Sequence, residues 1–175
     1  MIKGDIMNKK TVIFDLDGTL ADIDIRRNKS LKPNGKLDWD IFAAPKSILA
    51  WDKPNLPVIK MAQLFKADGF KIVIFSGRND RGFFATKKWL ADNDVPFDLL
   101  VLRPDKFKDK SWPIADGNPA TPDMRFMPDD ILKKKMLDTF VDINDVFVVV
   151  DDRQKVVDMW RDLGLNTWQV APGDF

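Results

Sequence analysis

The fold of this chain is decided by one stretch, Val12-Ile13-Phe14-Asp15-Leu16-Asp17-Gly18-Thr19-Leu20. An apolar, β-branched run without polar alternation predicts a buried central strand of a parallel sheet. Ligands of open α/β sheets bind just beyond the carboxyl ends of such strands. Asp15 and Asp17 therefore stand where a functional site is expected, beside main-chain amides that a turn at Gly18 would offer to an anion.

Composition limits the chemistry that this site can use. The chain has 175 residues, a formal net charge of +1, and neither cysteine nor histidine. The length suits one domain, and the small net charge means that any nucleic-acid contact must come from a local patch. Without thiols and imidazoles, disulfides, zinc sites and Ser-His-Asp or Cys-His catalysis are excluded. The chemistry must rest on carboxylates, lysine, arginine, hydroxyls and a hard cation.

Neither a signal peptide nor a membrane span is evident in the sequence. Residues 1–10 carry charges without an apolar core, so we expect a short leader that is not a signal peptide. Apolar runs are all shorter than the roughly 20 residues that a membrane-spanning helix needs. We therefore expect a cytoplasmic protein with no membrane partner.

Strand and helix patterns alternate along the chain. Strands are expected at 11–15, 70–75, 97–102, 146–150 and 167–170, and helices at 58–67, 81–92, 128–140 and 154–163. This alternation predicts βαβ units and a doubly wound, Rossmann-like parallel sheet of the α/β class in a single domain, 1–175. The proline-rich segments 21–57 and 103–123 are expected to be insertions rather than a large cap. Within the first, a short helical turn is expected at 38–42.

A second pair of carboxylates, Asp151 and Asp152, also follows an apolar strand. If that strand neighbours the first, about 4.8 Å away, the two acidic ends come within reach of one ion. Clustered carboxylates repel one another unless a cation lies among them, and oxygen ligands without histidine or cysteine suit Mg²⁺. The alternative for either pair alone is a set of turn-forming aspartates.

Two further motifs carry polar groups that could hold a phosphate. Ser76-Gly77-Arg78 ends the second predicted strand, where the serine hydroxyl and the following amides can bind a phosphoryl oxygen. Lys133-Lys134-Lys135 opens a predicted helix. Because each helical step turns by about 100°, at most one of these lysines is expected to point into a site. The alternatives are an ordinary turn and a solvated helix face.

These four motifs, in this order, resemble the haloacid dehalogenase (HAD)-like phosphatases. A closer similarity is to the 3′-phosphatase domains of T-even bacteriophage polynucleotide kinase/phosphatases. It covers residues 11–175, with extra residues near 28–36 and 105–124. The stretches that carry it are 14–21 (FDLDGTLA), 74–78 (IFSGR), 129–133 (DDILK) and the segment 151–175, which includes DDR, VVDMWR and WQVAPGDF.

The resemblance implies a HAD-like fold and a covalent mechanism. Asp15 would attack phosphorus and form an aspartyl-phosphate, and Asp17 would act as general acid and then general base. Mg²⁺ would be held by the Asp15 carboxylate, the Asp17 main-chain carbonyl and Asp151, with Asp152 supporting directly or through water.

The resemblance also implies residues that bind the substrate. Ser76 and Lys133 would bind phosphoryl oxygens, and Asp130 would orient Lys133. Other expected substrate contacts are Thr19, Arg26 (or Arg27), Gly77, Arg78 and Arg103, although each arginine could equally be an ordinary surface residue. The lysine-rich stretch 105–110 and Trp112 could form a strand-binding patch or an ordinary loop.

The sequence thus predicts a Mg²⁺-dependent phosphatase that removes 3′-phosphates from DNA or RNA ends during end repair. One alternative is a 5′(3′)-nucleotidase acting on nucleoside monophosphates. Another is a catalytically silent module that binds nucleic-acid ends. A P-loop is absent, since Gly77 and Gly82 are followed by Phe83 rather than lysine. Any 5′-kinase or ligase is therefore expected to be a separate partner.

Overall fold

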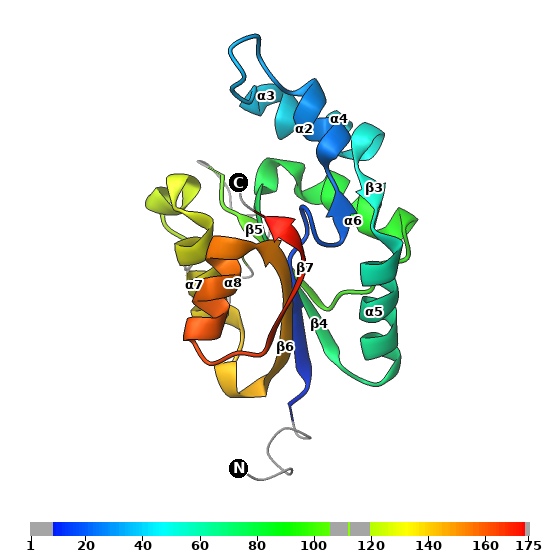
Figure 1. Ribbon diagram of the computed structural model, residues 1–175, viewed down its shortest axis with the longest axis vertical. Helices are drawn as coiled ribbons and strands as arrows, with labels where there is room; N and C mark the ends of the chain where they lie inside the picture. Colours follow the sequence, from blue (N-terminus) through cyan, green and yellow to red (C-terminus); the bar gives the residue numbers. More distant parts are fainter. Residues whose placement is uncertain (1–8, 106–111, 113–119, 174–175) are drawn as a thin grey trace.

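The computed structural model of the protein describes residues 9–105, 112 and 120–173. Its main sheet has five parallel strands in the order β5-β4-β1-β6-β7 (Figure 1). The strands are β1 (Thr11–Phe14), β4 (Lys71–Asn79), β5 (Leu99–Arg103), β6 (Val146–Arg153) and β7 (Thr167–Gly173). The predicted α/β class and parallel sheet are confirmed.

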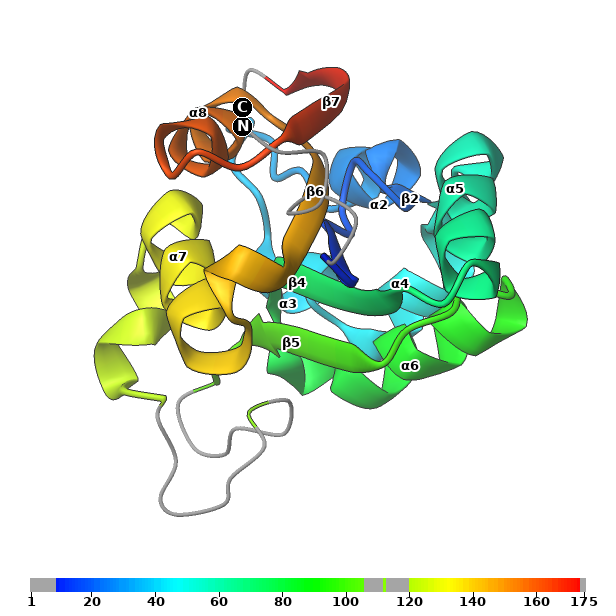
Figure 2. The ribbon, with the colours of Figure 1, turned by 90° about the horizontal axis from the view of Figure 1, so that it is seen from below.

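Helices cover both faces of this sheet (Figures 1 and 2). One face carries α5 (Leu56–Ala67) and α6 (Phe83–Asp92), and the other carries α7 (Asp129–Phe140) and α8 (Gln154–Asp162). Side chains of β1 alternate between the two cores: Val12 and Phe14 lie in one, and Ile13 in the other. Because both faces are buried, the central strand is apolar throughout from Val12 to Phe14.

Strand register brings the motifs to one edge of the sheet. Phe14 pairs with Ile74 of β4 and with Val150 of β6. The residues that follow these positions, Asp15 and Asp151 among them, therefore emerge side by side at the carboxyl ends of the strands. Strands β4 and β6 are longer than the sequence predicts, and each runs on through its motif into a shifted register with its outer neighbour.

Residues 21–57, expected to be a small, cap-like insertion made of loops, form a compact module with short helices. It contains α2 (Asp24–Lys29), α3 (Trp39–Phe42) and α4 (Pro45–Trp51), and a small antiparallel pair, β2 (Ala21–Asp22) with β3 (Lys53–Pro54). Figure 1 shows the module beyond the carboxyl ends of the strands. These helices are too short to display an apolar period in the sequence, and contacts such as that of the fully buried Ile48 with the main core hold them.

The predicted helical turn at 38–42 is confirmed as α3. The side chain of Asp38 caps it, because its Oδ1 accepts hydrogen bonds from the main-chain amides of Asp40 and Ile41 at 3.0 and 3.4 Å. A carboxylate at this position satisfies amides that the first helical turn leaves without partners.

The second insertion is described in part, and for Trp112 the structure excludes the strand-binding patch, one of the two alternatives for this segment. Trp112 is buried: its Nε1 donates to the carbonyl of Leu102 at 2.8 Å, and its ring packs against Phe140. A side chain anchored in the core in this way cannot form a strand-binding patch. The lysine-rich stretch after Asp105 and most of the expected leader lie outside the described residues. Within the described ranges, no helix has the length and apolar character to cross a membrane.

Candidate active site

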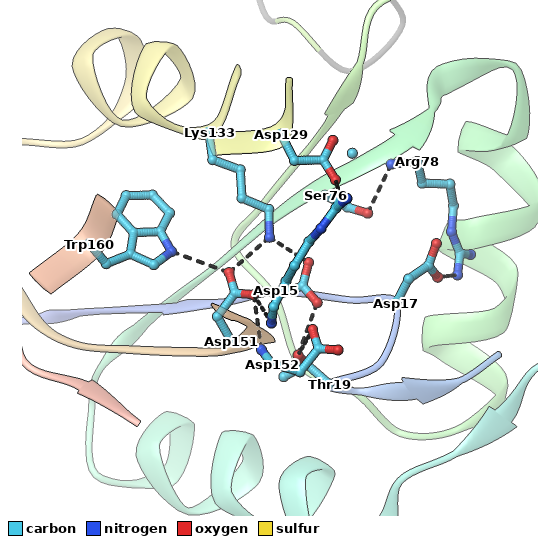
Figure 3. Close-up of polar contacts among 12 residues, drawn as sticks. Asp15, Asp17, Thr19, Ser76, Arg78, Asp129, Lys133, Asp151, Asp152 and Trp160 are labelled. Carbon is cyan, nitrogen blue, oxygen red and sulfur yellow. Dashed lines mark hydrogen bonds and ion pairs between the residues drawn. The ribbon is translucent and has the colours of Figure 1, made fainter. Parts of the chain in front are cut away.

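Three carboxylates meet at the carboxyl ends of β1 and β6. Asp15 follows β1, and Asp151 and Asp152 lie in β6; each offers an oxygen atom, and these atoms lie within 4.8 Å of one another. All three residues are buried. Figure 3 shows their side chains converging. The sequence predicts that both acidic pairs meet; the structure brings three of these four carboxylates together, and the carboxylate of Asp17 lies apart from them.

Lys133 of α7 is the cation of this cluster. Its Nζ donates to Asp15 Oδ1 at 2.6 Å and to Asp151 Oδ2 at 2.8 Å, and the lysine is 3% exposed. Trp160 Nε1 donates to the same Asp151 oxygen at 3.2 Å. Of the three successive lysines, Lys133 alone points inward, while Lys134 is exposed and pairs with Asp138.

The charge of the cluster is not balanced by the protein. Burial raises the pKa of Asp15 well above its usual range; Lys133 opposes this rise, and Asp151 and Asp152 add to it. Three carboxylates formally face one ammonium. An oxygen-only donor set with this excess of negative charge fits a hard divalent cation.

Thr19 connects the carboxylates rather than lying free for a substrate. Its hydroxyl is 2.9 Å from Asp15 Oδ2 and 3.3 Å from Asp152 Oδ1, so its one hydrogen can serve either oxygen. Gly18, with φ of 87°, adopts a left-handed conformation, and a Cβ atom there would collide with the carboxylate of Asp152. The turn after β1 therefore admits only glycine at this position.

Asp17 belongs to a different environment. Arg26 Nη2 donates to its Oδ1 at 2.9 Å, and Arg78 Nη2 donates to the same oxygen. Although burial alone would raise the pKa of Asp17, the guanidinium groups of Arg78 and Arg26 lower it to about 2. Both arginines line the cleft as expected, but their donors are engaged by the protein's own carboxylates.

Asp52, a residue that the sequence reasoning missed, holds the same two arginines. Its Oδ1 accepts from Arg26 Nε at 2.6 Å, its Oδ2 accepts from Arg78 Nη2 at 2.9 Å, and its side chain is fully buried. It caps the C-terminal end of α4. No motif marks it, because it lies in a segment that reads as a loop and 35 positions beyond Asp17.

A second arginine–carboxylate network lies on the other side of the strand ends. Asp129 accepts from both Arg103 and Arg153, and Arg103 Nε donates to the carbonyl of Gly77 at 3.0 Å. A Cβ atom on Gly77 would collide with the carboxylate of Asp129. Arg103 and Gly77, both expected to bind substrate, therefore also build the wall of the cleft.

Asp130 is placed differently from the expectation. One of its oxygens is 3.2 Å from Lys155 Nζ, whereas Lys133 is oriented by Asp15 and Asp151. The two buried carboxylates attract the ammonium group of Lys133 more strongly than a partly exposed one on the same helix.

Ser76 completes the group of predicted residues at the site. It is buried near the end of β4, where its Oγ accepts from the main-chain amide of Arg78 at 3.1 Å. It lines one cleft of about 740 Å³ together with Asp15, Asp17, Lys133, Asp151 and Asp152. The structure thus assembles a carboxylate cluster, a lysine, a serine hydroxyl and an arginine-held carboxylate around a single cleft.

A family model described as "Polynucleotide kinase PNKP phosphatase domain" matches residues 9–175. The chain belongs to this family. It is therefore a HAD-type phosphatase, a phosphoric monoester hydrolase, and the resemblance drawn from the sequence motifs is confirmed.

Solved structures agree with this assignment. A chain in the "Pnkp1/Rnl/Hen1 RNA repair complex" is 30% identical with a TM-score of 0.68, covering 97% of this chain and 44% of that one. A chain of another Pnkp1/Rnl/Hen1 complex structure is 29% identical with a TM-score of 0.69, covering 95% and 47%. The present chain thus spans less than half the length of these relatives.

A more distant likeness concerns the fold alone. A HAD-family enzyme from Bacteroides thetaiotaomicron, solved with magnesium and inorganic phosphate, is 13% identical with a TM-score of 0.52, covering 95% of this chain and 96% of that one. Nearly its whole length is matched, so the five-stranded unit with its flanking helices is the HAD-like fold that the sequence predicts.

Proposed function

We propose that this phosphatase removes the 3′-phosphate from polynucleotide ends in a Mg²⁺-dependent reaction that passes through a phosphorylated Asp15. The observation that carries the proposal is the placement of Asp15 between Lys133 and the Asp151–Asp152 pair, within a chain of the polynucleotide kinase phosphatase-domain family. A nucleophilic carboxylate, a fixed ammonium group and a cation site are what attack on a phosphate ester requires.

The first step transfers the phosphoryl group to the protein. An oxygen of Asp15 bonds to phosphorus, the bond from phosphorus to the 3′ oxygen breaks, and Asp17 gives a proton to that oxygen. Because Arg26 and Arg78 lower the pKa of Asp17 to about 2, this step requires that the bound phosphate draw these arginines away, so that Asp17 can carry the proton. Lys133 and the hydroxyl of Ser76 would hold the phosphoryl oxygens, since both line the cleft beside Asp15. In the second step Asp17 takes a proton from water, which attacks phosphorus and releases inorganic phosphate and free Asp15.

Asp15, Asp151, Asp152 and the main-chain carbonyl of Asp17 would hold the Mg²⁺ ion. The buried oxygen-only cluster fits this ion, and the ion would neutralise the negative charge that gathers when an anionic substrate meets three carboxylates. The fold-related enzyme named above with magnesium and phosphate is consistent with this choice.

RNA ends are the substrate that the comparisons favour. The two most similar solved chains reported above come from complexes named for Pnkp1, Rnl and Hen1, one of them called an RNA repair complex. We infer that the present domain acts in the same kind of repair, and that kinase and ligase activities lie in other segments or partner polypeptides.

Phosphate release with Mg²⁺ tests the proposal. The substrates are a 3′-phosphorylated oligoribonucleotide, its deoxy counterpart, a 5′-phosphorylated oligonucleotide and both 3′- and 5′-mononucleotides. Preference for the 3′-phosphorylated strands is expected. Preference for mononucleotides would support a nucleotidase instead, which the position of the helical module beyond the strand ends also allows. No release from any of them would overturn the assignment and leave a silent end-binding module.

A further inference from the structure

Two large aromatic side chains are exposed at the active-site cleft. Trp39 is 65% exposed and Phe126 is 81% exposed, and both line the same cleft as Asp15. They come from unrelated segments: Trp39 begins α3 in the helical module, and Phe126 ends the short 3-10 helix η2 (Pro122–Phe126) before α7. Exposed apolar rings gathered at one concave surface indicate a binding site.

The tryptophan is held by the protein without being covered. Its ring meets Phe42 edge-on, with centroids 5.6 Å apart, and Arg81 Nη2 donates to its carbonyl at 3.1 Å. Phe42 in turn lies against the guanidinium group of Arg26, 4.3 Å from the ring centroid. Arg26 donates to Asp17, so a continuous line of contacts joins the exposed ring to the catalytic carboxylate.

The phenylalanine is presented in a similar way. The segment around it is fixed by Arg103, whose Nη1 donates to the carbonyls of Met124 and Met127 at 2.9 and 2.7 Å. The guanidinium carbon of Arg125 lies 5.0 Å from the centroid of the Phe126 ring. A cation next to an exposed ring forms a surface suited to a base with an adjoining phosphate.

Charge in the cleft also suits a nucleic-acid strand. Arg27, Arg81 and Arg125 line it, and Arg81 and Arg125 contact Trp39 and Phe126 respectively. Among its acidic side chains, Asp17 and Asp129 pair with arginines, and the three of the carboxylate cluster form the proposed Mg²⁺ site rather than the surface near the aromatics. The volume, about 740 Å³, is within the range of about 300–1,000 Å³ that holds an organic ligand, far more than one phosphate requires.

We propose that Trp39 and Phe126 are stacking platforms for the unpaired bases next to the 3′-phosphate, and that they determine the preference for a polynucleotide over a mononucleotide. This inference rests on the proposed function and adds the residues that select the substrate. Aromatic side chains beside basic groups bind single strands with little dependence on sequence, because every base presents a flat face.

The test compares Trp39→Ala and Phe126→Ala with Phe84→Ala. Phe84 of α6 is 68% exposed but is not among the residues that line the cleft, so it is a matched control. Substrates are a 3′-phosphorylated single-stranded oligonucleotide and the same oligonucleotide with abasic sugars at its last three positions. Each variant at the cleft should raise KM for the normal oligonucleotide about tenfold with kcat nearly unchanged, which is the size expected for one stacked base.

The abasic substrate distinguishes stacking from damage to the protein. Wild type should show a high KM for it, and neither Trp39→Ala nor Phe126→Ala should raise that KM further. Trp39→Phe and Phe126→Trp should keep KM for the normal oligonucleotide near the wild-type value, as should Phe84→Ala. Equal KM values of wild type and both alanine variants on the normal oligonucleotide would overturn the proposal that Trp39 and Phe126 stack on bases. That result would leave the 3′-phosphatase assignment intact. Failure of the wild type on every 3′-phosphorylated strand would overturn both.

Discussion

The two sides of the active-site cleft hold negative charge in opposite ways. On the sheet side, Asp15, Asp151 and Asp152 formally face one cation, Lys133. On the module side, the carboxylates of Asp17 and Asp52 share two arginines, Arg26 and Arg78, so their formal charges cancel. Except for Asp17, whose side chain is 19% exposed, these carboxylates are buried on both sides, and the main difference lies in the number of cations that the chain supplies.

This difference in charge balance indicates different roles for the two sides: the sheet side for metal binding and chemistry, and the module side for positioning Asp17. A cluster with an excess of two negative charges is electrostatically complete only when a divalent cation binds to it. A neutral network of paired charges is complete by itself, and its geometry fixes Asp17 relative to the strand ends. We therefore expect substitutions on the sheet side to change metal binding and chemistry, and those on the module side to change orientation and stability.

The largest effect is expected for Asp15→Asn. Loss of the nucleophile should lower kcat on the order of 10⁴-fold or more, since no other group can form the covalent intermediate. Burial and the neighbouring carboxylates raise the pKa of Asp15 although Lys133 opposes the rise, so keeping this carboxylate ionised in the fold costs free energy. The variant should therefore melt, with EDTA present, at a temperature no lower than wild type. Retained turnover would remove Asp15 from its proposed role.

The second-largest effect is expected from removal of the metal, which should affect the sheet side of the cleft and not the module side. EDTA should abolish activity, and saturating Mg²⁺ at 100 times its Kd should stabilise the wild type by about 2.7 kcal/mol in thermal unfolding. Asp151→Asn should lose most of this stabilisation, because it removes one member of the cluster. Asp138→Asn, which alters an exposed carboxylate paired with Lys134, is the control and should respond like wild type. An equal Mg²⁺ response in both variants would argue against the cluster as the metal site.

Asp52→Asn tests the module side. The substitution leaves Arg26 and Arg78 short of one buried negative charge, which should cost about 3–5 kcal/mol of unfolding free energy. Misplacement of Asp17 should lower kcat on the order of 100-fold, while the stabilisation by Mg²⁺ persists. Asp40→Asn is the matched control within the same module. The carboxylate of Asp40 is exposed, and its ion pair with Arg81 is long, at 3.5 Å, so its loss should cost little. A variant with normal kcat would show that Asp17 needs no such support.

The smallest effect is expected far from the cleft, at Asp98. Its carboxylate accepts from Lys66 Nζ at 2.6 Å and from the amide of Ile72 at 2.8 Å. Although partial burial alone would raise the pKa of Asp98, these hydrogen bonds lower it, so the carboxylate stabilises the fold above its unfolded pKa. Asp98→Asn should cost below about 1 kcal/mol at pH 7 in urea unfolding, with unchanged kcat. The cost should shrink as pH falls below about 4, where the unfolded group takes up its proton.

The sheet side of the cleft was largely predictable from sequence, and the module side was not. Apolar strands that end in carboxylates can be recognised from a short stretch of sequence. Parallel pairing of these strands then brings Asp15 and Asp151 together at one edge of the sheet. Helical geometry predicted that at most one of the three successive lysines points into the site, and the family resemblance favoured Lys133. By contrast, the short helices of residues 21–57 have no period long enough to detect, and their stability comes from contacts with distant residues.

The sequence by itself therefore determined the fold class, the strand edge at which the site lies, and the carboxylates and lysine that meet there, because strand and helix periods and motif positions are local properties. Only the tertiary structure decided that Asp52 holds Arg26 and Arg78 against Asp17, that Asp130 faces Lys155, and that Trp112 is a core residue. A buried charge takes whichever partner the packing of distant segments brings near it, and no local pattern records that choice.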